Sequence, residues 1–248
     1  MASTEKLYIG TSGWSYRWQG ILYPEDMKSA DFLSYYATRF NTTELNRSFY
    51  HFTMLKTIEK WLATTPASFR FAAKLHQEVT HKRRLVDAEE PLEKFMSRFL
   101  AMGDRLGPVL VQLPGSLHFD FGVAAPFFRM LREKYTAPVF AVEARHKSWF
   151  TEQAQDLLQE YDISWVISSA GKRFPKLETT TTDTVYLRLH GDEKMYAAAY
   201  SEEQLERYAF MIHDWLLAEK EVWVYFNNTI LGHAVTDAQK LRELLENM

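Results

Sequence analysis

The stretch TVYLRLHG at residues 184–191 decides the fold of this chain of 248 residues. Its side chains alternate with a period of two, which predicts a β-strand. Valine and leucine form one face of this strand, and Tyr186, Arg188 and His190 form the other, before Gly191 ends it. An aliphatic face opposite polar groups that gather toward the carboxyl end is typical of a strand in a parallel barrel.

The rest of the chain repeats this pattern, because strand-like runs alternate with amphipathic helices. Strands are predicted at residues 7–11, 42–45, 69–75, 109–113, 138–143, 163–167, 184–191 and 222–226. Helices are predicted at residues 29–40, 55–63, 92–106, 123–134, 152–161 and 234–245, and after a capping box at 201–204. Only the segment after the sixth strand lacks a clear long helix.

This alternation predicts a parallel sheet, and eight repeats predict its closure into a (β/α)8 TIM barrel that is irregular after the sixth strand. A doubly wound open sheet is the alternative. No GxGxxG motif follows the first strand, so a dinucleotide-binding fold is less favoured. No linker or compositional break divides the chain, and we expect a single domain over residues 1–248.

The composition narrows the class of protein. Hydrophobic residues make up 46% of the chain and charged residues 25%, which is typical of a soluble globular protein. The absence of cysteine excludes disulfides, thiolate nucleophiles and cysteine-based zinc sites. We find neither a signal peptide nor a membrane-spanning run, and we expect a cytoplasmic protein. The net charge of −3 argues against bulk nucleic-acid binding, although it leaves a local basic cleft open.

Polar residues at the carboxyl ends of the predicted strands share one face, which in a barrel is the lumen. They are Glu44, Asn46, Lys74, His76, Gln112, Glu143, Arg145, Ser168, Arg188, His190, Tyr225 and Asn227. Any one of them is equally well explained as a strand-end group bonded to its neighbours. Together they form a ring that is costly to desolvate unless it binds a ligand or is densely cross-bonded.

The charge of this ring predicts a small anionic ligand. Three cations (Lys74, Arg145, Arg188) face two carboxylates (Glu44, Glu143), which leaves +1 with histidine neutral. A phosphate or carboxylate suits such a mouth. The predicted substrate-binding residues are Lys74, Arg145, Arg188, Asn46, Gln112, Asn227, Tyr225, Trp14 and Trp149. For the two tryptophans, packing against the wall of the cleft is the default alternative to stacking on a ligand. The basic run at residues 82–84 is better explained as a solvated loop than as part of this mouth.

Three side chains are candidates for catalysis. Glu143 is a candidate general base among cations, and His190 is a candidate general acid. Glu44 is the third candidate, although an ion pair that only orients Lys74 explains it better. A metal site would recruit Glu143 and His190 with His76 and His233, ligands that suit zinc or manganese. No HExxH or similar spacing supports this, so no metal or other cofactor is predicted.

Eight segments, in order, resemble the DUF72 family, also called YecE-like. They are GTSGWSYRWQGILYP, FNTTELNRSFY, FRFAAKL, VLVQLP, VEARHKSWF, VYLRLHG, YSEEQL and YFNNTILGHA. The combination is specific and covers nearly the whole chain. The resemblance implies a TIM barrel and implies little about activity, because the family is of unknown function.

The positions that match the family pattern are Gly10, Gly13, Trp14, Glu44, Asn46, Phe49, Lys74, Gln112, Pro114, Glu143, Arg145, Trp149, Arg188, His190, Gly191, Phe226, Asn227, Asn228 and Ala234. One position departs from it. Similar sequences often carry Asp at the exit of the sixth strand, where this chain has Ser168. If that Asp served relatives as a metal ligand or base, this chain would lack the group.

Three hypotheses follow. The first is an enzyme of hydrolase or lyase type that acts on a small anionic substrate at the carboxyl mouth. The second is a metal-dependent phosphodiesterase that binds DNA, by analogy with barrel endonucleases. The third is a non-catalytic barrel that only binds a ligand. The second predicts bound metal and salt-sensitive DNA affinity, whereas the sequence does not separate the first from the third. The sequence leaves the oligomeric state open.

Overall fold

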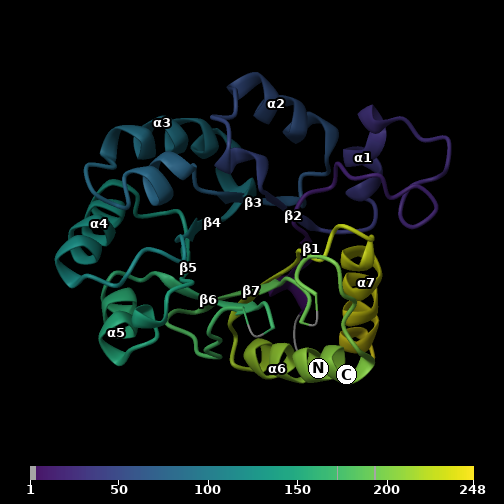
Figure 1. Ribbon diagram of the computed structural model, residues 1–248. Coiled ribbons are helices and arrows are strands. Elements are labelled where there is room, and N and C mark those ends of the chain that lie inside the picture. Colours follow the sequence, from purple (N-terminus) through teal and green to yellow (C-terminus); the bar gives the residue numbers. More distant parts are fainter. Residues whose placement is uncertain (1–3, 172, 193) are drawn as a thin grey trace.

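The computed structural model describes residues 4–171, 173–192 and 194–248 of the chain. Eight parallel strands close into a barrel in the order of the sequence (Figure 1). The strands are β1 Leu7–Thr11, β2 Thr42–Leu45, β3 Arg70–Lys74, β4 Leu106–Gln112, β5 Phe140–Glu143, β6 Ser164–Ser169, β7 Thr184–Leu189 and β8 Glu221–Phe226. The predicted TIM-type barrel is therefore confirmed, and the open sheet is not formed.

Helices surround the barrel (Figure 1). The α-helices are α1 Phe32–Tyr36, α2 Leu55–Thr64, α3 Glu89–Phe99, α4 Phe121–Lys134, α5 Glu152–Glu160, α6 Glu202–Leu217 and α7 His233–Glu246. Shorter 3-10 turns are η1 Thr4–Lys6, η2 Ser29–Asp31, η3 Arg47–Phe49, η5 Leu100–Arg105 and η6 Lys147–Trp149, and η4 Glu78–Lys82 is a π-helix. In the described residues between β6 and β7 there is no helix, as the sequence predicts.

Two predicted helices are wrong in extent. The helix expected at 29–40 is a 3-10 turn followed by the five residues of α1. It ends at Tyr36 because the chain turns back to begin β2 at Thr42, and the Tyr36 hydroxyl donates to the Thr42 carbonyl at 3.1 Å. The helix expected at 92–106 breaks at Gly103, whose φ of 55° and ψ of −135° lie outside the helical region.

The barrel interior is divided into an apolar and a polar half. Small and aromatic side chains fill the amino half of the lumen, where Trp223 stacks on Tyr8 with ring centroids 3.9 Å apart. The buried members of this cluster are Ala72, Leu110, Ala141, Val166, Tyr186, Trp223 and Tyr225. Each lies before the polar end of its strand, so the lumen is a packed core beneath the mouth.

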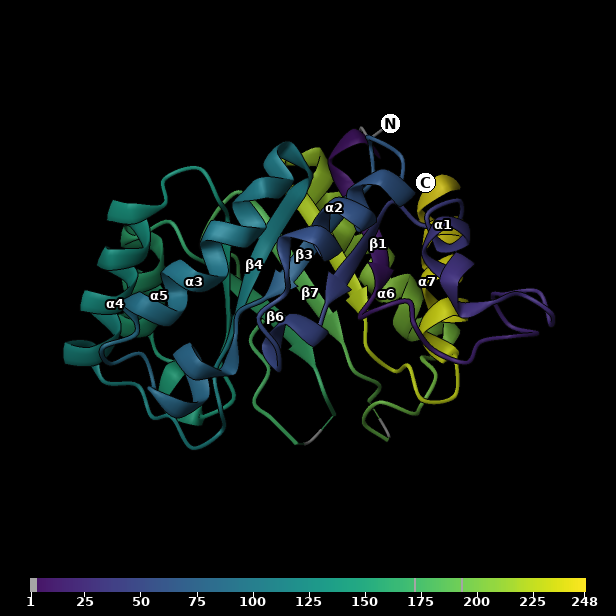
Figure 2. The ribbon, with the colours of Figure 1, turned by 90° about the horizontal axis from the view of Figure 1, so that it is seen from above.

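Figure 2 shows both termini at one end of the barrel and the loops after β6 and β7 at the other. The capping box at the start of α6 is formed as predicted. Ser201 Oγ accepts from the Gln204 amide at 3.2 Å, and Gln204 Oε1 accepts from the Ser201 amide at 2.9 Å. In the part of the chain that the structure describes, no helix has the length and apolar character needed to cross a bilayer.

Gly10 allows β1 and β2 to approach each other closely. A Cβ atom there would lie 2.1 Å from the carbonyl oxygen of Thr42.

We predict that Gly10→Ala lowers the free energy of unfolding by about 3 kcal/mol, because neither backbone can move away without breaking the sheet. Urea denaturation measures the change. Gly115 is the matched control, because a Cβ atom added there has its nearest neighbour at 4.0 Å. Gly115→Ala should therefore change the free energy of unfolding by less than about 0.5 kcal/mol. Equal midpoints for the two variants would contradict the close approach.

Candidate functional site

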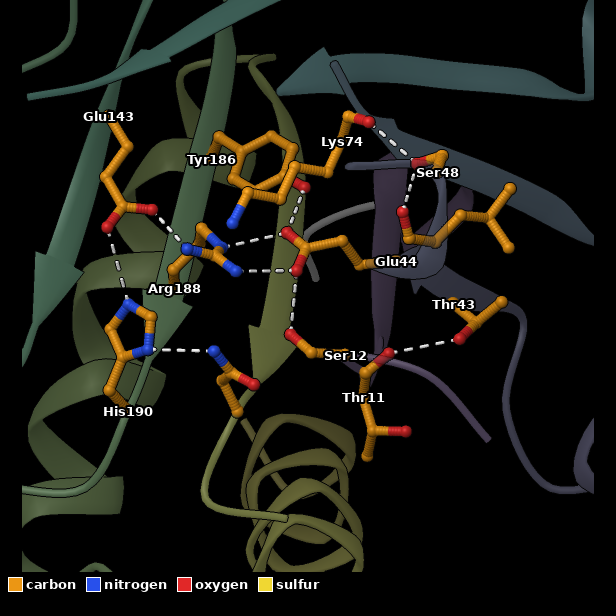
Figure 3. Close-up of polar contacts among 12 residues, drawn as sticks. Thr11, Ser12, Thr43, Glu44, Ser48, Lys74, Glu143, Tyr186, Arg188 and His190 are labelled. Atoms are coloured by element: carbon orange, nitrogen blue, oxygen red, sulfur yellow. Dashed lines mark hydrogen bonds and ion pairs between the residues drawn. The ribbon is translucent and has the colours of Figure 1, made fainter. Parts of the chain in front are cut away.

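Arg188 lies at the centre of the carboxyl half of the lumen and is 1% exposed. From β7 its guanidinium reaches across the lumen to Glu44 on β2, with Nε and Nη2 donating to the two carboxylate oxygens at 2.9 and 2.8 Å. Its Nη1 donates to Glu143 on β5 (Figure 3). All three nitrogens of the guanidinium are thus engaged by carboxylates inside the protein.

Glu44 is held by two further side chains. Tyr186, also on β7, donates its hydroxyl to one carboxylate oxygen at 2.7 Å, and Ser12 donates to the other at 2.8 Å. Burial alone would raise the pKa of Glu44, but the charge and hydrogen bonds of Arg188, with those of Tyr186 and Ser12, lower it. Glu44 is therefore a fixed anion with both oxygens satisfied.

Glu143 is a second fixed anion. Besides Arg188, it accepts from Arg145 Nε at 3.0 Å, and its Oε1 lies 3.6 Å from His190 Nε2. Burial opposes its ionisation, yet the charges of Arg188 and Arg145, with His190, hold the pKa of Glu143 well below its usual range. A carboxylate with so low a pKa is a weak proton acceptor at neutral pH.

His190 follows β7 and is 1% exposed. Its Nδ1 lies 3.0 Å from the Asn227 side-chain nitrogen, and its Nε2 makes no hydrogen bond with any described residue. Because the Asn227 amide donates to Nδ1, neutral His190 carries its proton on Nε2. Burial lowers the pKa of His190, so this neutral form prevails at pH 7.

Lys74 ends β3, is half-buried, and points toward Arg188 (Figure 3). Its Nζ lies 4.2 Å from the centroid of the Phe49 ring and makes no ion pair or hydrogen bond with any described residue. Burial and the charges of Arg188 and Arg145 lower the pKa of Lys74 to about 7, against the opposing charges of Glu143 and Glu44. The expected ion pair between Glu44 and Lys74 is therefore wrong. The planar guanidinium of Arg188 matches both carboxylate oxygens of Glu44, and it binds this carboxylate instead of Lys74.

Two further basic side chains face Lys74 from the exit loops. Arg145, after β5, is half-buried, and its guanidinium carbon lies 4.8 Å from the centroid of the Phe174 ring. His81 lies in the π-helix η4, where burial and the charges of Lys74, Arg145 and Arg84 lower its pKa to about 4. At neutral pH His81 is uncharged, so the positive charge near Lys74 comes from Arg145 and Arg188. π-Helical turns occur frequently at functional sites.

The remaining predicted binding residues differ in their burial and in their hydrogen-bond partners. Asn46 Oδ1 is buried without a hydrogen-bond partner, Gln112 donates to the Leu113 carbonyl at 2.6 Å, and Tyr225 bonds Thr42 at 2.7 Å. Trp149 lies in the core, 1% exposed, with its indole nitrogen donating to the Leu117 carbonyl at 3.0 Å.

Trp14 lines a cleft of about 680 Å³ above the carboxyl ends of β1 and β2. Ser12, Glu44 and Asn46 also line this cleft, and Trp14 meets Trp61 edge to face with ring centroids 5.6 Å apart. The cleft therefore joins an aromatic wall to the carboxylate that Arg188 binds.

The four residues of the metal hypothesis do not come together. Glu143 and His190 are neighbours, whereas His76 stacks on Phe52 with ring centroids 3.8 Å apart, and His233 begins α7. Among the described residues, no three histidine or carboxylate side chains form a group that could hold a metal ion. Ser168 Oγ, at the position that departs from the family pattern, is buried without a hydrogen-bond partner.

Sequence reasoning missed Ser12 and His81. Ser12 lies two residues beyond Gly10 on the lumen face of β1, so the parity that selected the other strand ends would also have selected it. His81 carries no such signal, because a π-helix leaves no recognisable period in the sequence.

Comparisons with known proteins agree with the fold. The family model described as "Protein of unknown function DUF72" matches residues 8–248. A DUF72 family protein from Thermotoga maritima MSB8 has a crystal structure with a TM-score of 0.86 and 33% sequence identity, covering 96% of this chain and 98% of that one. The chain belongs to the DUF72 family.

Two further relatives of this DUF72 protein span nearly its whole length. The UPF0759 protein YunF of Bacillus subtilis (strain 168) is 25% identical over 272 residues, which cover 97% of this chain and 95% of YunF. A DUF72 family protein from Enterococcus faecalis V583 has a TM-score of 0.85 at 20% identity, covering 96% of this chain and 95% of that one, and shares the fold. The family description carries no activity, so the function has to be argued from the site.

We predict that Arg188→Met lowers the free energy of unfolding by about 3–5 kcal/mol, because it leaves two buried carboxylates without their cation. Guanidinium denaturation measures the change. The control is Lys240→Met, which removes an exposed 3.0 Å pair with Glu202 and should cost about 1 kcal/mol or less. Adding Glu44→Gln and Glu143→Gln to Arg188→Met should recover part of the loss, because neither buried carboxylate then lacks its cation. A loss from Arg188→Met no larger than that from Lys240→Met would contradict the network.

Proposed function

We propose that this DUF72 protein is an enzyme that binds a small phosphate- or carboxylate-bearing substrate between Lys74 and Arg145 at the carboxyl mouth, and that Lys74 exchanges protons with it. One observation carries the proposal. A half-buried lysine with no anionic partner among the described residues lies among other cations at the end of the barrel where such enzymes hold their sites.

The charge balance supports an anionic substrate. Arg145 and Arg188 are matched by Glu44 and Glu143, so Lys74 carries the surplus positive charge. All the guanidinium nitrogens of Arg188 are engaged, and this residue is 1% exposed. The anion would therefore bind to Lys74 and Arg145. Burial and the repulsion from Arg188 and Arg145 lower the pKa of Lys74, and an anion there would offset both effects.

The pKa values support Lys74 as the proton-exchanging group. Efficient acid–base catalysis needs a pKa near the working pH, and that of Lys74 is about 7. The pKa of Glu143 lies well below this range, so Glu143 and Glu44 serve as positioning groups that hold Arg145 and Arg188. Neutral His190, with an unpaired Nε2–H, is the second candidate donor.

The cleft beside Glu44 supports a substrate that is larger than its anionic group. At about 680 Å³ it has room for a small organic molecule, and Trp14 and Trp61 give it an apolar wall. Asn46 also lines the cleft, and its buried Oδ1 has no hydrogen-bond partner among the described residues.

We predict that the protein binds acetate and sulfate and that their affinity falls as the pH rises above about 7. A bound anion favours the ammonium form of Lys74 and raises its pKa, so binding takes up a proton once the free protein has lost it. The decrease should be at most about tenfold per pH unit, because one proton is linked. Isothermal titration calorimetry between pH 6 and pH 9 measures the effect. The other groups with shifted pKa values that face Lys74 keep their charge over this range: Arg188, Glu143 and Glu44 stay ionised, and His81, with a pKa of about 4, stays neutral.

Three variants complete this experiment. Lys74→Arg keeps a permanent charge and should bind with no pH dependence, whereas Lys74→Met should bind at least about tenfold more weakly at pH 6. Lys240→Met, on the outer helix α7, should behave as wild type. Binding that is absent in the wild type, or equally strong in Lys74→Met, would refute the proposed function.

A further inference from the structure

We infer that the substrate is an anionic carbonyl compound, such as a 2-oxo acid, and that Lys74 captures its carbonyl carbon as an imine while Arg145 holds the carboxylate. This inference rests on the proposed function, because it uses the same anion site. It adds the chemical class of the substrate and a covalent step.

The surroundings of Lys74 suit a nucleophilic amine. Its Nζ packs over Phe49 at 4.2 Å and has no carboxylate partner among the described residues. A lysine becomes nucleophilic when it is desolvated or placed next to another cation, because both favour the neutral amine. Both conditions hold here, since burial, Arg188 and Arg145 bring the pKa of Lys74 to about 7.

Three other lysines of the chain, Lys134, Lys82 and Lys240, have the opposite environment. Lys134 pairs with both Glu89 and Glu93, which raise its pKa. Lys82 lies 2.9 Å from Glu78, and Lys240 lies 3.0 Å from Glu202. An ammonium group held by carboxylates has no lone pair to offer, so we expect capture of a carbonyl compound to be selective for Lys74.

Arg145 offers a place for the carboxylate of the substrate. Its Nε is engaged by Glu143 at 3.0 Å, but its two Nη atoms make no hydrogen bond with any described residue. Two free Nη groups in one plane match the two oxygens of a carboxylate. In a 2-oxo acid the carbonyl carbon is bonded directly to the carboxylate carbon. We therefore infer that an acid held by Arg145, whose charge acts on Lys74, would present its carbonyl within reach of that lysine.

Unpaired polar atoms around the mouth are an independent sign of a ligand. Ser168 Oγ, Asn46 Oδ1 and His190 Nε2 are buried and lack hydrogen-bond partners among the described residues. His190 is 1% exposed, and Ser168 is paired in register with Arg188. Buried groups of this kind normally have partners, and the oxygens of a bound oxo acid and its carbinolamine supply them.

The step needs no co-reactant. The lone pair of the neutral Lys74 amine attacks the carbonyl carbon, and the carbonyl oxygen takes one amine proton to give a carbinolamine. Loss of that hydroxyl with the second amine proton releases one water and leaves a carbon–nitrogen double bond. Hydrolysis reverses the step. Nothing is oxidised or reduced.

The test is reductive trapping. The full-length protein is incubated with pyruvate or glyoxylate, treated with sodium borohydride, and analysed by intact mass and peptide mapping. We predict a single reduced adduct on the peptide that contains Lys74, whose yield rises with oxo-acid concentration and falls when sulfate competes. The matched controls are Lys74→Arg, which keeps the charge and should lose the adduct, and Lys134→Arg, which should label as wild type.

Wild-type protein that shows no adduct, or adducts spread over surface lysines, would overturn the inference. Labelling of Lys74→Arg to the wild-type extent would do the same. Acetate binding by the same protein separates the two proposals. If acetate binds but no adduct forms, imine formation fails and the anion site stands. If acetate does not bind either, both fail.

Discussion

The buried contact of Arg188 with two carboxylates is the interaction on which the rest of the site depends. It joins β7 to Glu44 on β2 and to Glu143 on β5, across the buried lumen. Desolvating three charges is costly, and their attraction offsets that cost only when the hydrogen bonds are complete. Tyr186 and Ser12 complete them at Glu44. The network thus holds three strands and the exit of β1 in one fixed arrangement.

The same cation has the opposite effect on Lys74. For Glu44 and Glu143 the charge of Arg188 stabilises the ionised form, whereas for Lys74 it opposes the ionised form. Burial and the charge of Arg188 together therefore separate the ionisable groups of the mouth into fixed anions and a lysine whose pKa is about 7. Such separation of pKa values is typical of catalytic sites. Under the proposed function, the stability of the barrel and the proton exchange at its mouth would then depend on the same residue.

The fold follows from the sequence because a strand period of two fixes both the strands and the face each residue occupies. That parity placed Arg188, Glu143 and Lys74 in the lumen. It could not show that Glu44 pairs with Arg188 instead of Lys74, because contacts across a barrel depend on strand tilt and stagger, which no local pattern contains. The burial of Trp149 in the core could not be predicted for a similar reason, since a tryptophan after a strand has the same sequence pattern in the core as in a cleft. The helix breaks at Tyr36 and Gly103 arise from tertiary constraints and backbone freedom, which outweigh helical periodicity.

A crystal structure of the protein grown in sulfate below pH 7 tests the central claim most directly. Lys74 is then charged, and the account predicts an anion within hydrogen-bonding distance of Lys74 Nζ and the Nη atoms of Arg145. The bonds from Arg188 to Glu44 and Glu143 should be unchanged beneath it. An anion bound to Arg188 in place of either glutamate, or a mouth in which Lys74 forms an ion pair with Glu44, would contradict the account.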